Sequence, residues 1–120
     1  MEKFFPGPLT IILKKKNIVP DTVTAGQETV GVRMPSGEMA RKLVELSGVP
    51  IATPSANISG QPSGTNLSEI KENFKESVDF YIDGGNSELG ISSTIVQVID
   101  GKIKILRQGS ITLEQIEKEI

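Results

Sequence analysis

Short runs of branched apolar and aromatic residues recur along the chain, and proline, glycine or polar residues bound each run. Runs of this length and composition are typical of β-strands rather than helices. The pattern predicts strands at residues 9–14, 29–34, 49–53, 79–83, 94–99 and 103–107. Asp100 and Gly101 separate the last two runs, which predicts a tight hairpin there. The polar stretch at 17–27 is expected to be a loop.

A second spacing predicts helices. From Glu38 the apolar positions recur at helical intervals until Gly48, which is placed as a C-terminal stop. Asn66 is placed to cap a helix that runs to about Lys75, and residues 112–120 are expected to form a closing helix. Strands that alternate with short helices, together with one hairpin, predict an α/β or α+β domain with a mixed sheet.

Composition narrows the class of protein. The chain has 120 residues and a net charge of -2, which is typical of one soluble domain over residues 1–120. It has no cysteine and no histidine, which excludes Cys/His zinc sites, disulfides, cysteine nucleophiles and Ser-His-Asp triads. No apolar run has the length of a membrane span and no signal peptide is visible, so we expect a cytoplasmic protein.

The charge distribution bears on nucleic-acid binding. A mildly acidic chain does not favour a large non-specific nucleic-acid surface. Lys14, Lys15 and Lys16 form a local cationic run, for which two interpretations stay open. The run is either a solvated strand end or a small RNA-binding patch.

The stretch at 51–65 is the strongest candidate for a binding loop. An apolar run opens there into short polar side chains, glycines and prolines, and such loops on rigid scaffolds carry function disproportionately. The alternative is a polar surface connection punctuated by turns. The candidate donors and acceptors are Thr53, Ser55, Asn57, Ser59 and Ser63.

Other segments place cationic or small residues at strand ends. Thr29 and Arg33 lie four positions apart in a predicted strand, hence on one face, where a guanidinium suits carboxylate or phosphate. The alternative for Arg33 is a surface arginine paired to a nearby acid. Arg107 ends the last strand just before a glycine turn, and residues 5–10 form a stiff turn in which glycine permits close backbone approach.

The glycine- and serine-rich segment 83–94 has two interpretations. Its backbone amides are suited to an anion-binding concavity, or the segment is a flexible hairpin loop. It lacks the spacing of a Walker loop, and the chain lacks the GxGxxG dinucleotide fingerprint.

Five motifs follow one another in order: Phe-Pro-Gly-Pro-Leu-Thr at 5–10, Thr-Val-Gly-Val-Arg-Met-Pro at 29–35, Ile-Ala-Thr-Pro-Ser-Ala-Asn-Ile-Ser-Gly at 51–60, Ser-Ser-Thr-Ile-Val at 92–96 and Ile-Leu-Arg-Gln-Gly at 105–109. Together they closely resemble the YrdC-like family, over nearly the whole chain. The resemblance implies a twisted mixed α/β sheet with short flanking helices and a concave, positively lined cavity. It implies formation of threonylcarbamoyl-AMP from L-threonine, bicarbonate and ATP, an intermediate for threonylcarbamoylation of tRNA adenosine 37.

The resemblance also implies residue roles. The positions that match ATP contacts are Thr29, Ser55, Ser63 and Arg107, those that match threonine contacts are Arg33, Thr53 and Ser93, and Asn57 and Thr10 are supporting residues. Magnesium is expected to arrive with the nucleotide rather than in a protein site. No residue is assigned as acid, base or nucleophile, because positioning and electrostatic stabilisation suffice.

The sequence also departs from the family pattern. The family's catalytic domain is longer, and its first part carries a threonine- and tyrosine-bearing turn and a Lys-x-Arg segment that this sequence does not contain. We therefore expect the chain to correspond to the C-terminal part of such a domain, with weak ATP binding and little or no synthase activity alone. Gln108 stands where the family commonly has proline, whereas Arg107 and Gly109 are retained.

Three hypotheses for function follow. The first is a threonylcarbamoyl-AMP synthase or its degenerate fragment. The second is a module that binds double-stranded RNA or tRNA without catalysis. The third is an assembly subunit that self-associates or completes its sheet with a separate N-terminal half.

Overall fold

The computed structural model describes residues 3–85 and 92–119. The chain divides into two compact units, the sheet unit, Met1–Pro50 with Ile91–Ile120, and the loop unit, Ile51–Gly90. The prediction that residues 1–120 form one domain stays a prediction.

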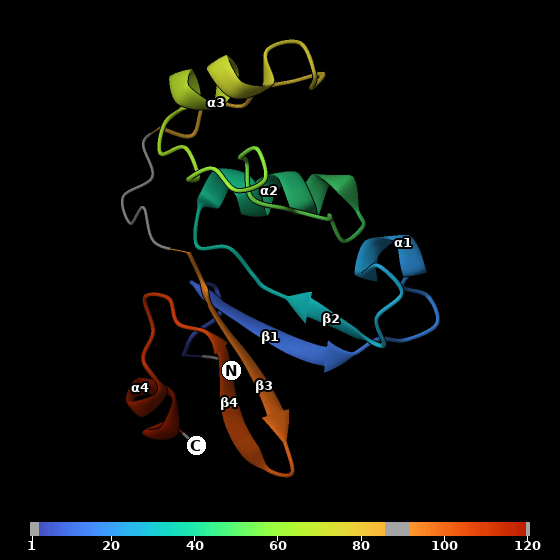
Figure 1. Ribbon diagram of the computed structural model, residues 1–120, viewed down its shortest axis with the longest axis vertical. Coiled ribbons are helices and arrows are strands. Elements are labelled where there is room, and N and C mark those ends of the chain that lie inside the picture. The colour runs from blue at the N-terminus through green and yellow to red at the C-terminus, as the bar shows by residue number, and fades with distance from the viewer. Residues whose placement is uncertain (1–2, 86–91, 120) are drawn as a thin grey trace. The chain divides into compact units, whose positions relative to one another are not determined.

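The sheet unit is built on a four-stranded mixed sheet in the order β2-β1-β3-β4 (Figure 1). The strands are β1 Leu9–Lys14, β2 Thr29–Val32, β3 Thr94–Ile99 and β4 Lys102–Arg107. β1 is parallel to β3, and the β1/β2 and β3/β4 pairs are antiparallel. The mixed sheet and four of the predicted strands are therefore confirmed, although β2 is two residues shorter than predicted.

One face of this sheet carries the core. Leu9 and Ile11 alternate along β1 and are buried together with Val96 of β3. Ile111 and Ile116, from the C-terminal segment, complete this cluster. The strands are thus anchored by apolar burial on one face, which leaves the other face for polar chemistry.

A cross-strand row joins two candidate site residues, Thr10 and Arg107, through Ile95. Thr10 pairs with Ile95, and Ile95 pairs with Arg107 on the far side. The pairing register of β3 and β4 shifts between Ile95 and Val96, an irregularity of the β-bulge kind. This shift determines which residue of β3 lies opposite Arg107. Because side chains alternate along β1 and β3, Thr10 and Ile95 lie on the face away from Leu9 and Val96. The register shift then brings Arg107 opposite Ile95, although Ile105 pairs with Val96.

The hairpin between β3 and β4 has the predicted turn. Asp100 and Gly101 both adopt positive φ, at 51° and 74°. Two consecutive left-handed residues make a tight turn whose twist matches the strands that it joins. This prediction is confirmed.

The helices follow the prediction at most positions. The described helices are α1 Asp21–Thr24, α2 Glu38–Ser47, α3 Leu67–Phe74 and α4 Leu113–Glu117. Gly48 ends α2 at φ 65°, and the Asn66 side chain caps α3 by accepting from the amide of Glu69. α4 is shorter than predicted, and the prediction of a loop at 17–27 is wrong where α1 forms. No helix in residues 3–85 or 92–119 has the length and hydropathy to cross a membrane.

Two predicted strands are wrong. Residues 49–53 and 79–83 adopt no strand structure, and Val49 and Phe80 are 60% and 88% exposed. Apolar composition favours a strand only where a neighbouring strand pairs with its backbone, and no described strand pairs with either segment.

Burial predicts which isoleucine holds α4. Ile116 is 5% exposed in the core, whereas Ile18 is 85% exposed. We expect Ile116→Ala to lower the free energy of unfolding by about 2–4 kcal/mol through lost burial and a residual cavity. The matched variant Ile18→Ala should change it by less than about 0.5 kcal/mol. Urea unfolding followed by circular dichroism measures both, and equal effects would contradict the core assignment.

Candidate functional site

One end of the sheet collects four of the predicted site residues. Given the strand directions, this end gathers the C-terminus of β2, the N-termini of β1 and β3, and the C-terminus of β4 (Figure 1). These strand ends carry Arg33, Thr10, Ser93 and Arg107. We call this place the site end of the sheet.

Ser93, Arg107 and Thr10 form a connected polar cluster at the site end. Ser93 is only 6% exposed. The Arg107 guanidinium donates to the Ser93 carbonyl oxygen from Nε at 3.2 Å and from Nη2 at 2.9 Å, and Nη2 also donates to Ser93 Oγ at 3.1 Å. Thr10 Oγ1 and Ser93 Oγ share a further hydrogen bond at 2.8 Å. The contacts hold a long cationic side chain beside two hydroxyls.

Arg33 is fixed by the turn that precedes β1. Its Nε donates to the carbonyl oxygen of Gly7 at 3.0 Å, and the Gly7 amide donates to the Met34 carbonyl oxygen at 2.8 Å. A Cβ on Gly7 would lie 2.5 Å from the Phe4 carbonyl oxygen, so only glycine fits this turn without a shift. The predicted close approach at 5–10 is therefore present, and it serves to position Arg33.

Both arginines lack an acidic partner in the described residues. In residues 3–85 and 92–119, no carboxylate forms an ion pair with Arg33 or Arg107. The interpretation of Arg33 as a surface arginine paired to an acid is therefore wrong for this part of the chain. Guanidinium groups beside hydroxyls are suited to carboxylate or phosphate oxygens.

Residues 3–85 and 92–119 contain no group of three or more His, Cys, Asp or Glu placed to hold a metal.

Thr29 lies away from the site end. It begins β2 opposite Lys14, whereas Arg33 follows the other end of that strand. Four residues of extended chain span about 13 Å, so the two side chains share a face but not a local contact. That Thr29 and Arg33 serve one ligand stays a prediction.

The remaining predicted site residues belong to the loop unit. Asn57 Nδ2 donates to the carbonyl oxygens of Ile58 at 3.1 Å and Gln61 at 2.9 Å, and Asn57 Oδ1 accepts from Ser63 Oγ at 3.4 Å. Asn57 therefore ties the two sides of this loop together, and its supporting role at a ligand site stays a prediction. Thr53 and Ser55 are exposed.

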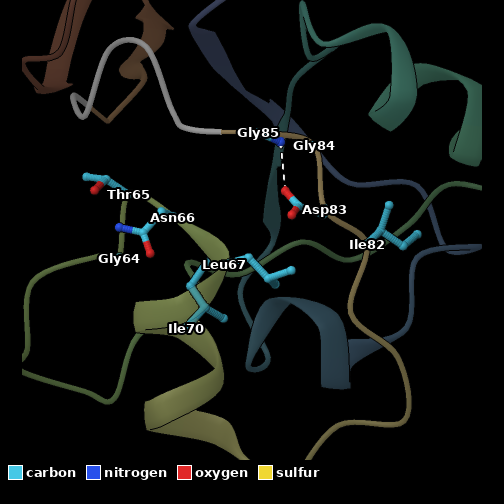
Figure 2. A pocket seen from close by; sticks show the side chains of 9 residues that line it. All are labelled: Gly64, Thr65, Asn66, Leu67, Ile70, Ile82, Asp83, Gly84 and Gly85. Carbon is cyan, nitrogen blue, oxygen red and sulfur yellow. Dashed lines mark hydrogen bonds between the residues drawn. The ribbon is translucent and has the colours of Figure 1, made fainter.

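The loop unit also holds a pocket of about 260 Å³, formed between the start of α3 and residues 82–85 (Figure 2). Its lining residues are Gly64, Thr65, Asn66, Leu67, Ile70, Ile82, Asp83, Gly84 and Gly85. None of the predicted loop-unit site residues lines it. The predicted anion-binding concavity at 83–94 lies in part outside the described residues, at 86–91, and stays a prediction.

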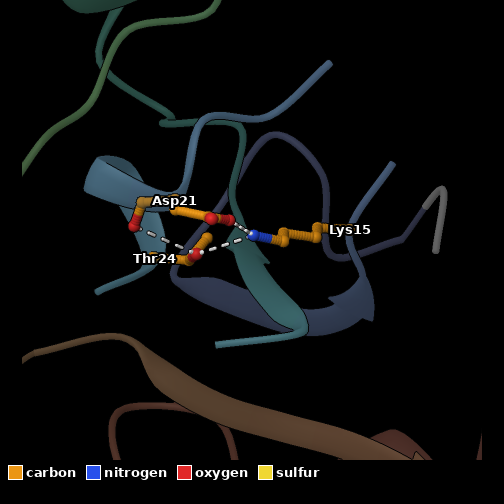
Figure 3. Close-up of polar contacts among 3 residues, drawn as sticks. All are labelled: Lys15, Asp21 and Thr24. Atoms are coloured by element: carbon orange, nitrogen blue, oxygen red, sulfur yellow. Dashed lines mark hydrogen bonds and ion pairs between the residues drawn. The ribbon is translucent and has the colours of Figure 1, made fainter. Parts of the chain in front are cut away.

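The lysine run at 14–16 is divided by the fold. The Lys15 side chain is only 10% exposed, and its ammonium donates to Asp21 Oδ1 and, at 3.3 Å, to Thr24 Oγ1 (Figure 3). Lys15 therefore holds α1 against the end of β1. Only Lys14 and Lys16 keep exposed positions, which weakens the interpretation of the run as an RNA-binding patch.

Comparison with known proteins gives the family. The profile of the Sua5, YciO and YrdC proteins, described as "Telomere recombination", matches residues 1–109. The chain belongs to the Sua5/YciO/YrdC family. It is 47% identical over 119 residues to the threonylcarbamoyl-AMP synthase of Pyrococcus abyssi and 43% identical over 121 residues to that of Bacillus subtilis. The resemblance in the five motifs is thereby confirmed.

A solved structure also matches this Sua5/YciO/YrdC chain. The structure of P. abyssi Sua5 complexed with L-threonine superposes with a TM-score of 0.94 at 47% identity, and the match covers 99% of this chain and 35% of that one. The sequence matches cover 99% and 100% of this chain but 35% of each curated relative. The chain thus spans about a third of the length of these two curated relatives.

Thr94 adjoins the polar cluster, and sequence reasoning did not single it out. The sequence places it within the segment 83–94, the motif 92–96 and the strand 94–99, yet it is 0% exposed and its hydroxyl is hydrogen-bonded. A signal was present, since Thr94 and Val96 share a strand face and a polar residue at a core position requires a partner.

The contact of Lys15 predicts a titration shift. The hydrogen bond and positive charge of Lys15 lower the pKa of the Asp21 carboxyl from its ordinary value of 3.8. The stabilisation is therefore present above the unfolded-state pKa and is lost as the pH falls through the lower folded-state pKa. NMR titration should give Asp21 a pKa below 3.8. In Lys15→Gln it should return toward that value, and in the matched variant Lys16→Gln it should not change. An unshifted Asp21 in the wild type would contradict the contact.

Proposed function

We propose that the chain contributes the L-threonine- and ATP-binding residues of a threonylcarbamoyl-AMP synthase. The observation that carries the proposal is the polar site end of the sheet. There Arg33 and Arg107 donate to backbone carbonyl oxygens, and neither forms an ion pair within the described residues. The chain is also 47% identical to such a synthase. The relative's solved structure is a complex with L-threonine. In the proposed reaction L-threonine, bicarbonate and ATP yield threonylcarbamoyl-AMP, pyrophosphate and water.

Threonine is bound by charge and short hydrogen bonds in this proposal. Arg33 pairs with the amino-acid carboxylate. Its Nε is held by the Gly7 carbonyl oxygen, and its two terminal nitrogens provide the donors for the carboxylate oxygens. Ser93 contributes a nearly buried hydroxyl that Thr10 and Arg107 orient. Thr53 is proposed to bind a further polar group of the amino acid.

The nucleotide is bound by the remaining predicted residues. Arg107 offsets phosphate charge, while Thr29, Ser55 and Ser63 donate to phosphate or ribose oxygens, and magnesium enters with ATP as part of the substrate. The carbamate oxygen formed from threonine and bicarbonate attacks the α-phosphorus, and pyrophosphate leaves with the electron pair of the broken P–O bond. The protein residues accelerate this step by positioning and charge stabilisation. The product's use in tRNA modification and a cytoplasmic location stay predictions.

The assembly-subunit hypothesis is the second candidate, and the surface of α2 favours it over RNA binding. Met39, Leu43 and Leu46 are 50%, 47% and 75% exposed, and α2 has no buried residue. Exposed apolar side chains on one helix mark a protein-binding surface more often than an RNA-binding one. We propose that a second copy of this chain covers α2.

Calorimetry of the purified chain tests the proposed function. We expect saturable binding of L-threonine, and ATP·Mg²⁺ binding that threonine strengthens. Arg33→Ala should weaken threonine binding at least about tenfold, because a charge-assisted carboxylate contact is lost. Arg107→Ala should weaken ATP binding by a similar factor.

The control is Lys118→Ala, which removes the same charge just after the end of α4 and should leave both affinities unchanged. No binding by a demonstrably folded sample would contradict ligand binding by this chain alone. Sedimentation of the same samples separates the second candidate, which predicts a mass above the 12.9 kDa of one chain.

A further inference from the structure

The hydroxyl of Thr94 is fully engaged inside the sheet unit. Thr94 is 0% exposed. Its Oγ1 donates to the Ile111 carbonyl oxygen at 2.7 Å and accepts from the amides of Gly109 and Ile111, each at 3.0 Å. One donor and two acceptor positions are the whole capacity of a hydroxyl. A single buried side chain therefore satisfies three backbone groups of the turn after β4.

That turn crosses the start of β3 at very close range. A Cβ on Gly109 would lie 2.2 Å from the Ser92 carbonyl oxygen and 2.4 Å from the Thr94 amide nitrogen. Both neighbours are backbone atoms, so no side-chain movement relieves the overlap. Gly109 thus allows the turn to lie directly on residues 92–94, where the Thr94 hydroxyl reaches it.

The Thr94 contacts and the polar cluster at the site end involve neighbouring residues. Ser93 immediately precedes Thr94, and Arg107 lies two residues before Gly109. When the turn after β4 is fixed on β3, the backbone of Arg107 is held next to Ser93. The result is the contact of Arg107 with the Ser93 carbonyl and hydroxyl oxygens at 2.9–3.2 Å.

We propose that Thr94 is a positioning residue, whose buried hydroxyl clamps the Gly109–Ile111 turn and so holds Arg107 on Ser93. Thr94 does not reach the ligand itself. Its importance for ligand binding rests on the proposed function, whereas its control of Arg107 does not.

The Nε–H resonance of Arg107 in a ¹H–¹⁵N spectrum of the full chain tests the clamp without any ligand. Bonded to the Ser93 carbonyl oxygen, this proton should exchange slowly in the wild type. Thr94→Val keeps the shape but removes the hydroxyl, and we expect the slow exchange to be lost. Thr94→Ser keeps the hydroxyl and should restore it. The control Thr112→Val removes the N-cap of α4 and should leave the Arg107 signal unchanged.

Binding of L-threonine provides the second measurement. In Thr94→Val the affinity should fall about tenfold, as expected when a site held by charged hydrogen bonds is loosened, and Thr94→Ser should recover most of it. If the wild type binds no threonine but Thr94→Val still releases Arg107, the proposed function fails and the clamp stands. If folded Thr94→Val keeps the wild-type Arg107 exchange, the clamp is wrong whatever the threonine result.

Gln108→Ala covers the case in which Thr94→Val does not fold. The exposed Gln108 side chain donates to the carbonyl oxygens of Gly109 and Ile111, both at 2.9 Å, and so supports the same turn from outside. The three hydrogen bonds of Thr94 remain in Gln108→Ala, so Arg107 Nε–H exchange should stay slow in this variant. Fast Arg107 exchange in a folded Gln108→Ala would show that the Thr94 hydroxyl does not hold Arg107 and would overturn the proposal.

Discussion

The parallel pairing of β1 with β3 is the constraint on which the sheet unit depends. It joins strands far apart in sequence, so that Thr10 and Ser93, 83 positions apart, share a hydrogen bond. Leu9 and Ile11 enter one core with Val96 through the same pairing. Shared burial therefore specifies the register, because a one-residue slip would move Thr10 to the core face and Ile11 to the polar face.

Two glycines bring the flanking turns close enough to complete the site end. Gly7 holds the turn before β1 against the end of β2 and gives Arg33 its backbone partner. Gly109 lets the turn after β4 lie on the start of β3, next to Arg107. Arg33 follows the end of β2 and Arg107 ends β4, and each guanidinium is oriented by a backbone carbonyl. A preformed cationic site of this kind loses less side-chain entropy when an anion binds.

Sequence reasoning succeeded where local signals and tertiary pairing agree. Local sequence was sufficient to predict three features: the turn at Asp100 and Gly101, the Asn66 cap, and the apolar strands β1 and β3. It failed at residues 49–53 and 79–83, because β-propensity does not reveal whether a strand partner exists. It also took the lysines at 14–16 as equivalent, since the contact of Lys15 with Asp21 depends on α1, which the sequence did not predict. The proposed roles of Ser93 and Arg107 came from family motifs, whereas the contacts of Thr94 with the turn after β4 are visible only in the structure.

We propose that the site end of the sheet binds the amino acid. The most direct measurement is a crystal structure of this chain with L-threonine. The account predicts the threonine carboxylate within hydrogen-bonding distance of the Arg33 guanidinium, with Ser93 Oγ beside the amino acid. Threonine bound elsewhere, for example in the pocket beside α3, with Arg33 and Ser93 uncontacted, would contradict it.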